Sequence, residues 1–105
     1  MKTTTWNNNK TRELFKAFLT LKDATEVASF CRDLMTESEI EEFASRLQVA
    51  KLLDQGLPQR QISKDTGVSI ATVTRVNQWL QRGMNGYKTV LNHLHHSSQP
   101  LASQG

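Results

Sequence analysis

The sequence lacks the features that mark secreted and membrane-bound proteins. Its one cysteine, Cys31, has no partner for a disulfide within the chain, which fits a reducing intracellular setting. It has no run of about 18 apolar residues that could span a membrane. The first residues also lack the basic and then apolar pattern of a signal peptide. We therefore expect a cytoplasmic protein that does not enter membranes.

Catalytic signatures are also missing. The sequence has no Ser/His/Asp arrangement, no phosphate-binding loop and no glycine-rich nucleotide fingerprint. His93, His95 and His96 form a cluster near the C-terminus, but no cysteine or carboxylate lies close by to complete a tetrahedral metal site. Exposed histidines on a terminal helix are the simpler interpretation, and Cys31 is best interpreted as a small buried apolar residue. We expect neither an enzyme nor a metal or cofactor site.

Apolar residues recur at helical spacing throughout the middle of the chain, and no segment alternates as a strand would. An all-α fold follows, with six helices between residues 10 and 96. Asp23 with Glu26 and Thr36 with Glu39 have capping-box spacing at two helix starts, while Gly56 ends the third helix. The side chains of the third helix that we expect to face inward are Ile40, Phe43, Ala44, Leu47, Ala50 and Leu53.

Residues 1–9 and 97–105 are polar and weakly patterned, so we expect flexible tails on a single domain of residues 10–96.

The first two helices carry more apolar side chains than a fold of this size can cover. Residues 10–21 alone contribute Leu14, Phe15, Phe18, Leu19 and Leu21. Uncovered apolar surface of this extent marks an interface, and symmetric pairs are the commonest assemblies. We expect a homodimer that forms through the N-terminal half.

Residues 59–80 read QRQISKDTGVSIATVTRVNQWL, the pattern of a helix-turn-helix. Gly67 stands where the first helix must end, because a tight turn there needs a positive φ. Ser69 suits the N-cap of the second helix. Val68 and Val73 have the spacing of a hydrophobic staple across that cap.

The second helix of this motif is suited to enter a major groove. Its expected exposed positions are small or hydrogen-bonding: Ile70, Ala71, Thr72, Thr74 and Arg75. Charge supports this interpretation, since residues 57–88 hold five basic side chains against one acidic, whereas residues 23–54 hold eight acidic against three basic. A basic half built around the motif predicts double-stranded DNA as the partner.

The stretch from Leu34 to Leu80 resembles the tryptophan repressor family of bacteria, in particular its YerC/YecD-type relatives. The shared signatures are Met35–Thr36, an acidic first turn, Ser45–Arg46, Gly56, Gln59–Arg60 and IATVTR at 70–75. The resemblance implies a Trp-repressor-like fold, an intertwined homodimer and a transcription regulator, most simply a repressor. Two helix-turn-helix heads related by a twofold axis would bind a palindromic operator.

The resemblance also implies roles for individual residues. Arg60, Ile70, Ala71 and Thr74 match residues that read bases, and an arginine can bind guanine O6 and N7 in bidentate fashion. Gln59, Lys64 and Thr72 are expected to contact phosphates, and Ser69 is counted with this DNA-binding set. Ser63 stands where the repressor has a lysine that helps read the operator, which suggests a different target sequence.

In the tryptophan repressor two arginines sandwich the indole of the bound amino acid, and both align here, as Arg46 and Arg75. Met35 and Thr36 resemble the backbone side of the same pocket. Val76 replaces a glycine that leaves room for the ligand, and Trp79 replaces a serine near its amino group, so the indole of Trp79 could fill the pocket from within. The effector therefore stays open between L-tryptophan, another small molecule and none. Arg46 could instead pair with Glu42 and Arg75 with a phosphate.

A helical protein-interaction module is the alternative function. Such a module would use the helix-turn-helix as a docking surface, for which large aromatic, Met or Leu anchors are typical. The small and polar residues Ala71, Thr72 and Thr74 favour DNA instead.

Overall fold

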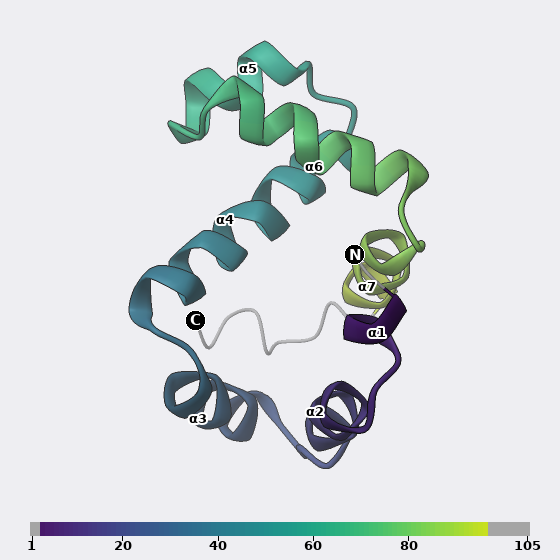
Figure 1. Cartoon of the computed structure of the whole chain (residues 1–105). Helices are drawn as coiled ribbons and strands as arrows, with labels where there is room; N and C mark the ends of the chain where they lie inside the picture. Colours follow the sequence, from purple (N-terminus) through teal and green to yellow (C-terminus); the bar gives the residue numbers. More distant parts are fainter. Residues whose placement is uncertain (1–2, 97–105) are drawn as a thin grey trace. The chain divides into compact units, whose positions relative to one another are not determined.

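The computed structural model describes residues 3–96, and within this range every regular element is an α-helix (Figure 1). The helices are α1 Thr3–Trp6, α2 Asn9–Leu19, α3 Ala24–Leu34, α4 Glu37–Asp54, α5 Gln59–Thr66, α6 Ile70–Arg82 and α7 Gly86–His96. The predicted all-α fold is confirmed, and its six helices correspond to α2 to α7. No helix among the described residues is long and apolar enough to cross a membrane.

Helix α1 lies within residues 1–9, where the sequence predicts only a flexible tail, so the described chain has one helix more than the predicted six. Side-chain contacts accompany this single turn. The Asn8 amide donates to the Thr4 carbonyl, and Asn8 Oδ1 accepts from the Thr11 N–H at 2.8 Å as the N-cap of α2. The Trp6 ring also lies 5.3 Å from that of Phe15. The predicted C-terminal tail, 97–105, lies outside the described residues.

The predicted starts of α3 and α4 are confirmed by their caps. Asp23 Oδ1 accepts from the Glu26 N–H at 2.9 Å, and Glu26 Oε1 accepts from the Lys22 N–H at 2.9 Å. Thr36 and Glu39 form the reciprocal pair of a capping box, with the Glu39 N–H donating to Thr36 Oγ1 at 3.1 Å and the Thr36 N–H to Glu39 Oε1 at 2.9 Å. Both starts are thus fixed by residues within four positions of the cap.

The described chain falls into two compact units, one up to Ile40 and one from Glu41. The N-terminal unit contains no buried side chain among the residues described. The Phe18 and Phe30 rings join α2 to α3 edge to face at 5.2 Å. Several large apolar side chains of this unit are nevertheless exposed: Trp6, Phe15, Leu19, Val27 and Leu34. A single chain therefore leaves this unit without a covered core.

The C-terminal unit has a core of its own. It buries Val49 and Ala50 from α4, Ile62 from α5, Val73, Val76 and Leu80 from α6, and Leu91 from α7. Ala50 faces inward as predicted. The prediction that Phe43, Ala44 and Leu47 face inward is wrong for a single chain, because α4 turns its Val49–Ala50 side to the core and leaves those three side chains exposed.

Candidate nucleic-acid interface

Helices α5 and α6 pack against each other and are joined by the short turn at Gly67–Ser69 (Figure 1). Gly67 has a φ of +78°, in the left-handed region, and its N–H donates to the Ser63 carbonyl at 2.9 Å. No atom lies within 4 Å of the place that a Cβ on this residue would take. The backbone conformation, and not a lack of space, therefore requires glycine here, as the sequence predicts.

Two hydroxyl groups hold the turn in place. Ser63 Oγ donates to the Val68 carbonyl at 2.6 Å, and Thr66 Oγ1 accepts from the Val68 N–H at 3.1 Å while it donates to the Ile62 carbonyl at 2.7 Å. Ser63 occupies the position at which the family resemblance places a DNA-reading lysine. Its hydroxyl is instead used to fix the angle between the two helices, a role that the sequence did not reveal.

Helix α6 begins as predicted. Ser69 Oγ accepts from the Thr72 N–H at 3.2 Å, which satisfies one of the free N–H groups at the helix start. The same hydroxyl donates to Thr72 Oγ1 at 3.0 Å. Val73 is fully buried, and Val68 packs against the core beside it. The N-cap is thus confirmed, and both valines lie where a hydrophobic staple would place them.

One face of α6 is anchored and the opposite face is exposed. The anchored face of α6 carries three buried side chains, Val73, Val76 and Leu80. Ile70 is 47% exposed, and Ala71, Thr74 and Arg75 are exposed as well. Thr72, which the sequence predicts to be exposed, is half-buried where it meets Ser69. The accessible surface at the start of α6 therefore consists of small, apolar and hydroxyl-bearing side chains, with one arginine.

A hydrogen bond joins two predicted DNA-binding residues on different helices. Thr74 Oγ1, on α6, donates to Gln59 Oε1, at the start of α5, at 2.8 Å. The two residues are fifteen positions apart in the sequence, so no local spacing could have revealed the contact. It fixes the amide of Gln59 beside the exposed face of α6.

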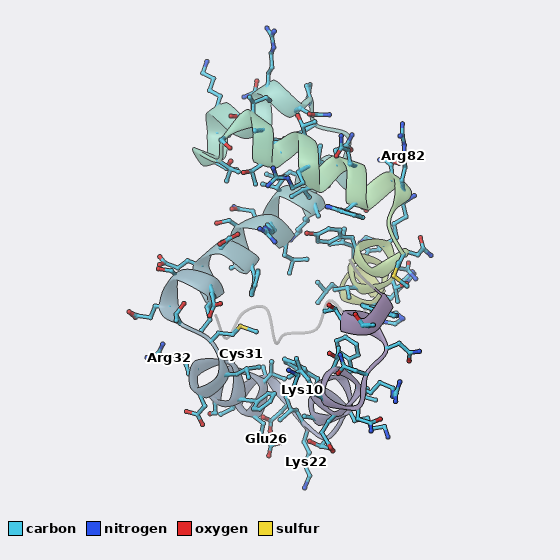
Figure 2. All side chains as sticks on the ribbon, in the orientation of Figure 1. Lys10, Lys22, Glu26, Cys31, Arg32 and Arg82 are labelled. Atoms are coloured by element: carbon cyan, nitrogen blue, oxygen red, sulfur yellow. The ribbon has the colours of Figure 1, made fainter. Side chains whose placement is uncertain are left out.

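The basic side chains around this face are not neutralised. Arg60 and Lys64 are exposed on α5, and Arg75 is exposed on α6. Within residues 3–96 the only ion pair joins Arg46 to Glu42. Arg82, in the last turn of α6, also extends away from the ribbon (Figure 2). Cations without carboxylate partners are suited to phosphate oxygens.

The five candidate effector residues are distributed over both units. Met35 and Thr36 belong to the N-terminal unit, where Thr36 is engaged in the cap of α4. Arg46 pairs with Glu42, the alternative considered from the sequence, and its guanidinium carbon lies 5.6 Å from the centre of the Phe43 ring. Arg75 is exposed on α6. No described contact joins the two arginines.

Trp79 does not pack into the core of its own chain. Its side chain is 59% exposed, whereas Val76, at the position of the family's glycine, is only 2% exposed and belongs to the core. The indole lies in an open, shallow apolar groove of α4, α6 and α7, which is also lined by Leu47, Gly83, Met84, Gly86, Tyr87 and Val90. Neither candidate arginine lines this groove.

The histidine cluster and Cys31 are the other residues that the sequence singles out. Within residues 3–96 no group of three or more His, Cys, Asp or Glu side chains is placed to hold a metal ion. The His95 and His96 rings face each other edge to face at 5.5 Å, and His93 is exposed. Cys31 is a half-buried free thiol on α3 (Figure 2).

Comparison with known proteins supports the resemblance seen in the sequence. The chain is 36% identical over 92 residues to the YerC protein of Bacillus subtilis, covering 88% of each chain. It is also 38% identical over 72 residues to the Trp operon repressor homolog of Chlamydia trachomatis, covering 64% of this chain and 77% of that protein.

A solved structure agrees with these relatives. The TrpR-like protein of Eubacterium eligens superposes with a TM-score of 0.82 at 36% identity, covering 88% of this chain and 95% of that one. The family model described as Trp repressor protein matches residues 9–95. The chain belongs to the Trp repressor family.

Proposed function

We propose that this chain is a sequence-specific transcription regulator, most simply a repressor, that binds a twofold-symmetric operator as a homodimer through α5 and α6. Its membership of the Trp repressor family supports a DNA-binding regulator. The observation that carries the finer proposal is the exposed face of α6. It combines small and hydroxyl side chains with unpaired cations on the neighbouring α5. We place its action in the bacterial cytoplasm, where the DNA is.

Two sets of residues would make different contacts with the DNA. The residues that would read base edges are Arg60, Ile70, Ala71 and Thr74. A side chain that reads a base edge must be exposed, and it must be either small or a long hydrogen-bond donor such as arginine. Gln59, Lys64, Ser69 and Thr72 hold phosphates near the start of α6, where the helix dipole also favours an anion. Base readers specify the operator, and phosphate contacts set the register.

The dimer would form through the N-terminal unit. Its apolar side chains are exposed in a single chain, and no described residue of this unit is buried. A second copy of the same unit is the simplest cover for such a surface. Two copies of α6 related by a twofold axis would then enter successive major grooves, about 34 Å apart.

We propose that DNA binding does not require L-tryptophan. Val76 occupies the place of the glycine that makes room for the amino acid in the repressor, and its side chain is part of the core. Arg46 is held by Glu42. The site that the resemblance assigns to an effector, with Met35, Thr36, Arg46, Arg75 and Trp79, would then be closed or serve another small molecule.

Selection of bound DNA from a random pool, with and without L-tryptophan, tests the proposal. We expect one palindromic site to be enriched in both arms. Enrichment only with the amino acid would show that Arg46 and Arg75 still form its pocket and would overturn the effector part. A failure to enrich any site in either arm would overturn the proposed readout of DNA.

A helical interaction module is the second candidate. The exposed Trp79 and Met84, side chains typical of docking anchors, favour it at the open apolar groove that α6 and α7 line. The first turns of α6 lack such anchors. A gel shift on bulk DNA over a salt series separates the two functions, because a docking module has little affinity for DNA and no steep dependence on salt.

A further inference from the structure

The hydrogen bond between Thr74 and Gln59 has a direction, and this direction limits what each side chain can do next. A threonine hydroxyl has one hydrogen to donate and two lone pairs that accept. The hydrogen of Thr74 goes to Gln59 Oε1 at 2.8 Å. Thr74 Oγ1 therefore presents only lone pairs to a ligand, and Gln59 presents the N–H groups of its Nε2.

We propose that Gln59 is a positioning residue that makes Thr74 a reader of a base amino group. The inference rests on the proposed binding of DNA by α6. In the major groove only adenine N6 and cytosine N4 offer N–H donors, whereas guanine and thymine offer acceptors at O6, N7 and O4. An acceptor-only hydroxyl at Thr74 thus selects adenine or cytosine at the base that it meets.

The surroundings of Thr74 support a contact with a base. It is exposed on the same side of α6 as Ile70 and Ala71, which precede it by four and three residues. Val73 beside it is fully buried and anchors this turn of the helix. Gln59 is half-buried at the start of α5, so its amide approaches Thr74 from the helix that also carries Arg60.

Selection of bound DNA with Gln59→Leu tests the inference. Every base pair carries one such amino group in the major groove, on adenine or on cytosine, so the readout depends on the strand on which that group lies. We expect the wild-type chain to prefer the selected base pair over the same pair reversed by about three- to tenfold, the range of one hydrogen bond. Loss of the amide acceptor frees the Thr74 hydroxyl to donate as well as accept, so the reversed pair becomes acceptable. We expect the preference to fall below about twofold in the variant. Thr74→Val identifies the base pair concerned, and Thr74→Ser should keep the preference.

Two further variants separate positioning from a structural role. Gln61→Leu is the matched control, because Gln61 lies on the same helix but donates to Asp65 at 2.8 Å on an exposed surface. It should leave base preference unchanged. Gln59→Glu keeps the acceptor but loses the N–H donors, so it should weaken binding on all sequences alike and retain the preference.

Three results would overturn the inference. One is a wild-type chain that binds equally well when the base pair that Thr74→Val identifies is reversed, which moves its amino group to the other strand. Another is Gln59→Leu with weaker binding but an unchanged preference, which is the signature of a merely structural role. The third is the absence of any selected site for the wild-type chain, in which case the proposed function fails with it; the first two outcomes leave the proposed function standing.

Discussion

Replacing Gly67 by alanine tests whether backbone conformation alone dictates this residue. Gly67 has a φ of +78°, and the space for a Cβ is empty. The left-handed conformation costs an L-residue roughly 1–2 kcal/mol. Alanine also restricts the unfolded chain, which returns about 0.4–1 kcal/mol. We therefore expect a net loss of up to about 1.6 kcal/mol in the free energy of unfolding, centred near about 0.8 kcal/mol.

Urea denaturation, followed by circular dichroism, measures this loss. Wild type and variants must be compared at one protein concentration, since the stability of a dimer depends on it. The midpoint should fall with an unchanged slope. Gly67→Asn is the informative companion, because asparagine tolerates the left-handed region and should recover part of the loss. The reasoning is refuted if alanine stabilises the chain, if asparagine is no better than alanine, or if alanine costs more than about 3 kcal/mol, which would indicate a clash.

Three further changes address the interface. Arg60→Ala should cost about 1–3 kcal/mol on the selected operator and relax specificity at one base pair, measured by competition among operator variants; unchanged affinity and unchanged preference would remove α5 from the groove. Lys64→Ala should weaken binding alike on all sequences and reduce the slope of log affinity against log salt by about one; a sequence-dependent loss would contradict a phosphate contact. Ser69→Ala should lower the free energy of unfolding by about 0.5–2 kcal/mol through loss of the N-cap of α6, and a stability equal to that of wild type would show that the hydrogen bond from the Thr72 N–H is replaced by water.

The parts of the fold that could be predicted from the sequence are those decided within a few residues. The Thr36–Glu39 capping box, the positive φ of Gly67 and the Ser69 cap each involve groups at most three positions apart, and all three occur in the structure. Helical periodicity adds the order of α2 to α7. Local chemistry was sufficient to place α6 and its start.

The features that escaped prediction depend on tertiary packing. The bond from Thr74 to Gln59 joins two helices, and its existence depends on how they cross. The exposure of Phe43 has a similar origin, because α4 has apolar residues on more than one side and periodicity cannot say which side its own chain covers. The sequence suggests that Trp79 could fill the effector pocket. In a single chain its side chain is 59% exposed and lies in a groove lined by residues of α4 and α7, an arrangement that periodicity cannot predict.

The N-terminal unit supplies the last prediction, which concerns assembly. Leu19, at the end of α2, is 85% exposed. A lysine at this place removes almost no contact within one chain, so a monomeric protein should tolerate Leu19→Lys without change. If a second copy covers this surface, the substitution buries a charge in an apolar interface, which is costly unless the charge is paired. We expect the dimer to dissociate at a concentration higher by about tenfold or more.

Sedimentation velocity over a dilution series measures this shift. Gln78→Lys is the matched control, since it adds the same charge at an exposed polar position of the C-terminal unit. The control should sediment as the wild type does. A wild-type chain that is monomeric at every concentration would contradict the assembly, and a Leu19→Lys chain as dimeric as its control would move the interface away from the end of α2. Because a palindromic operator requires two reading helices at once, the substitution that dissociates the dimer should also weaken operator binding while leaving the α5–α6 turn intact.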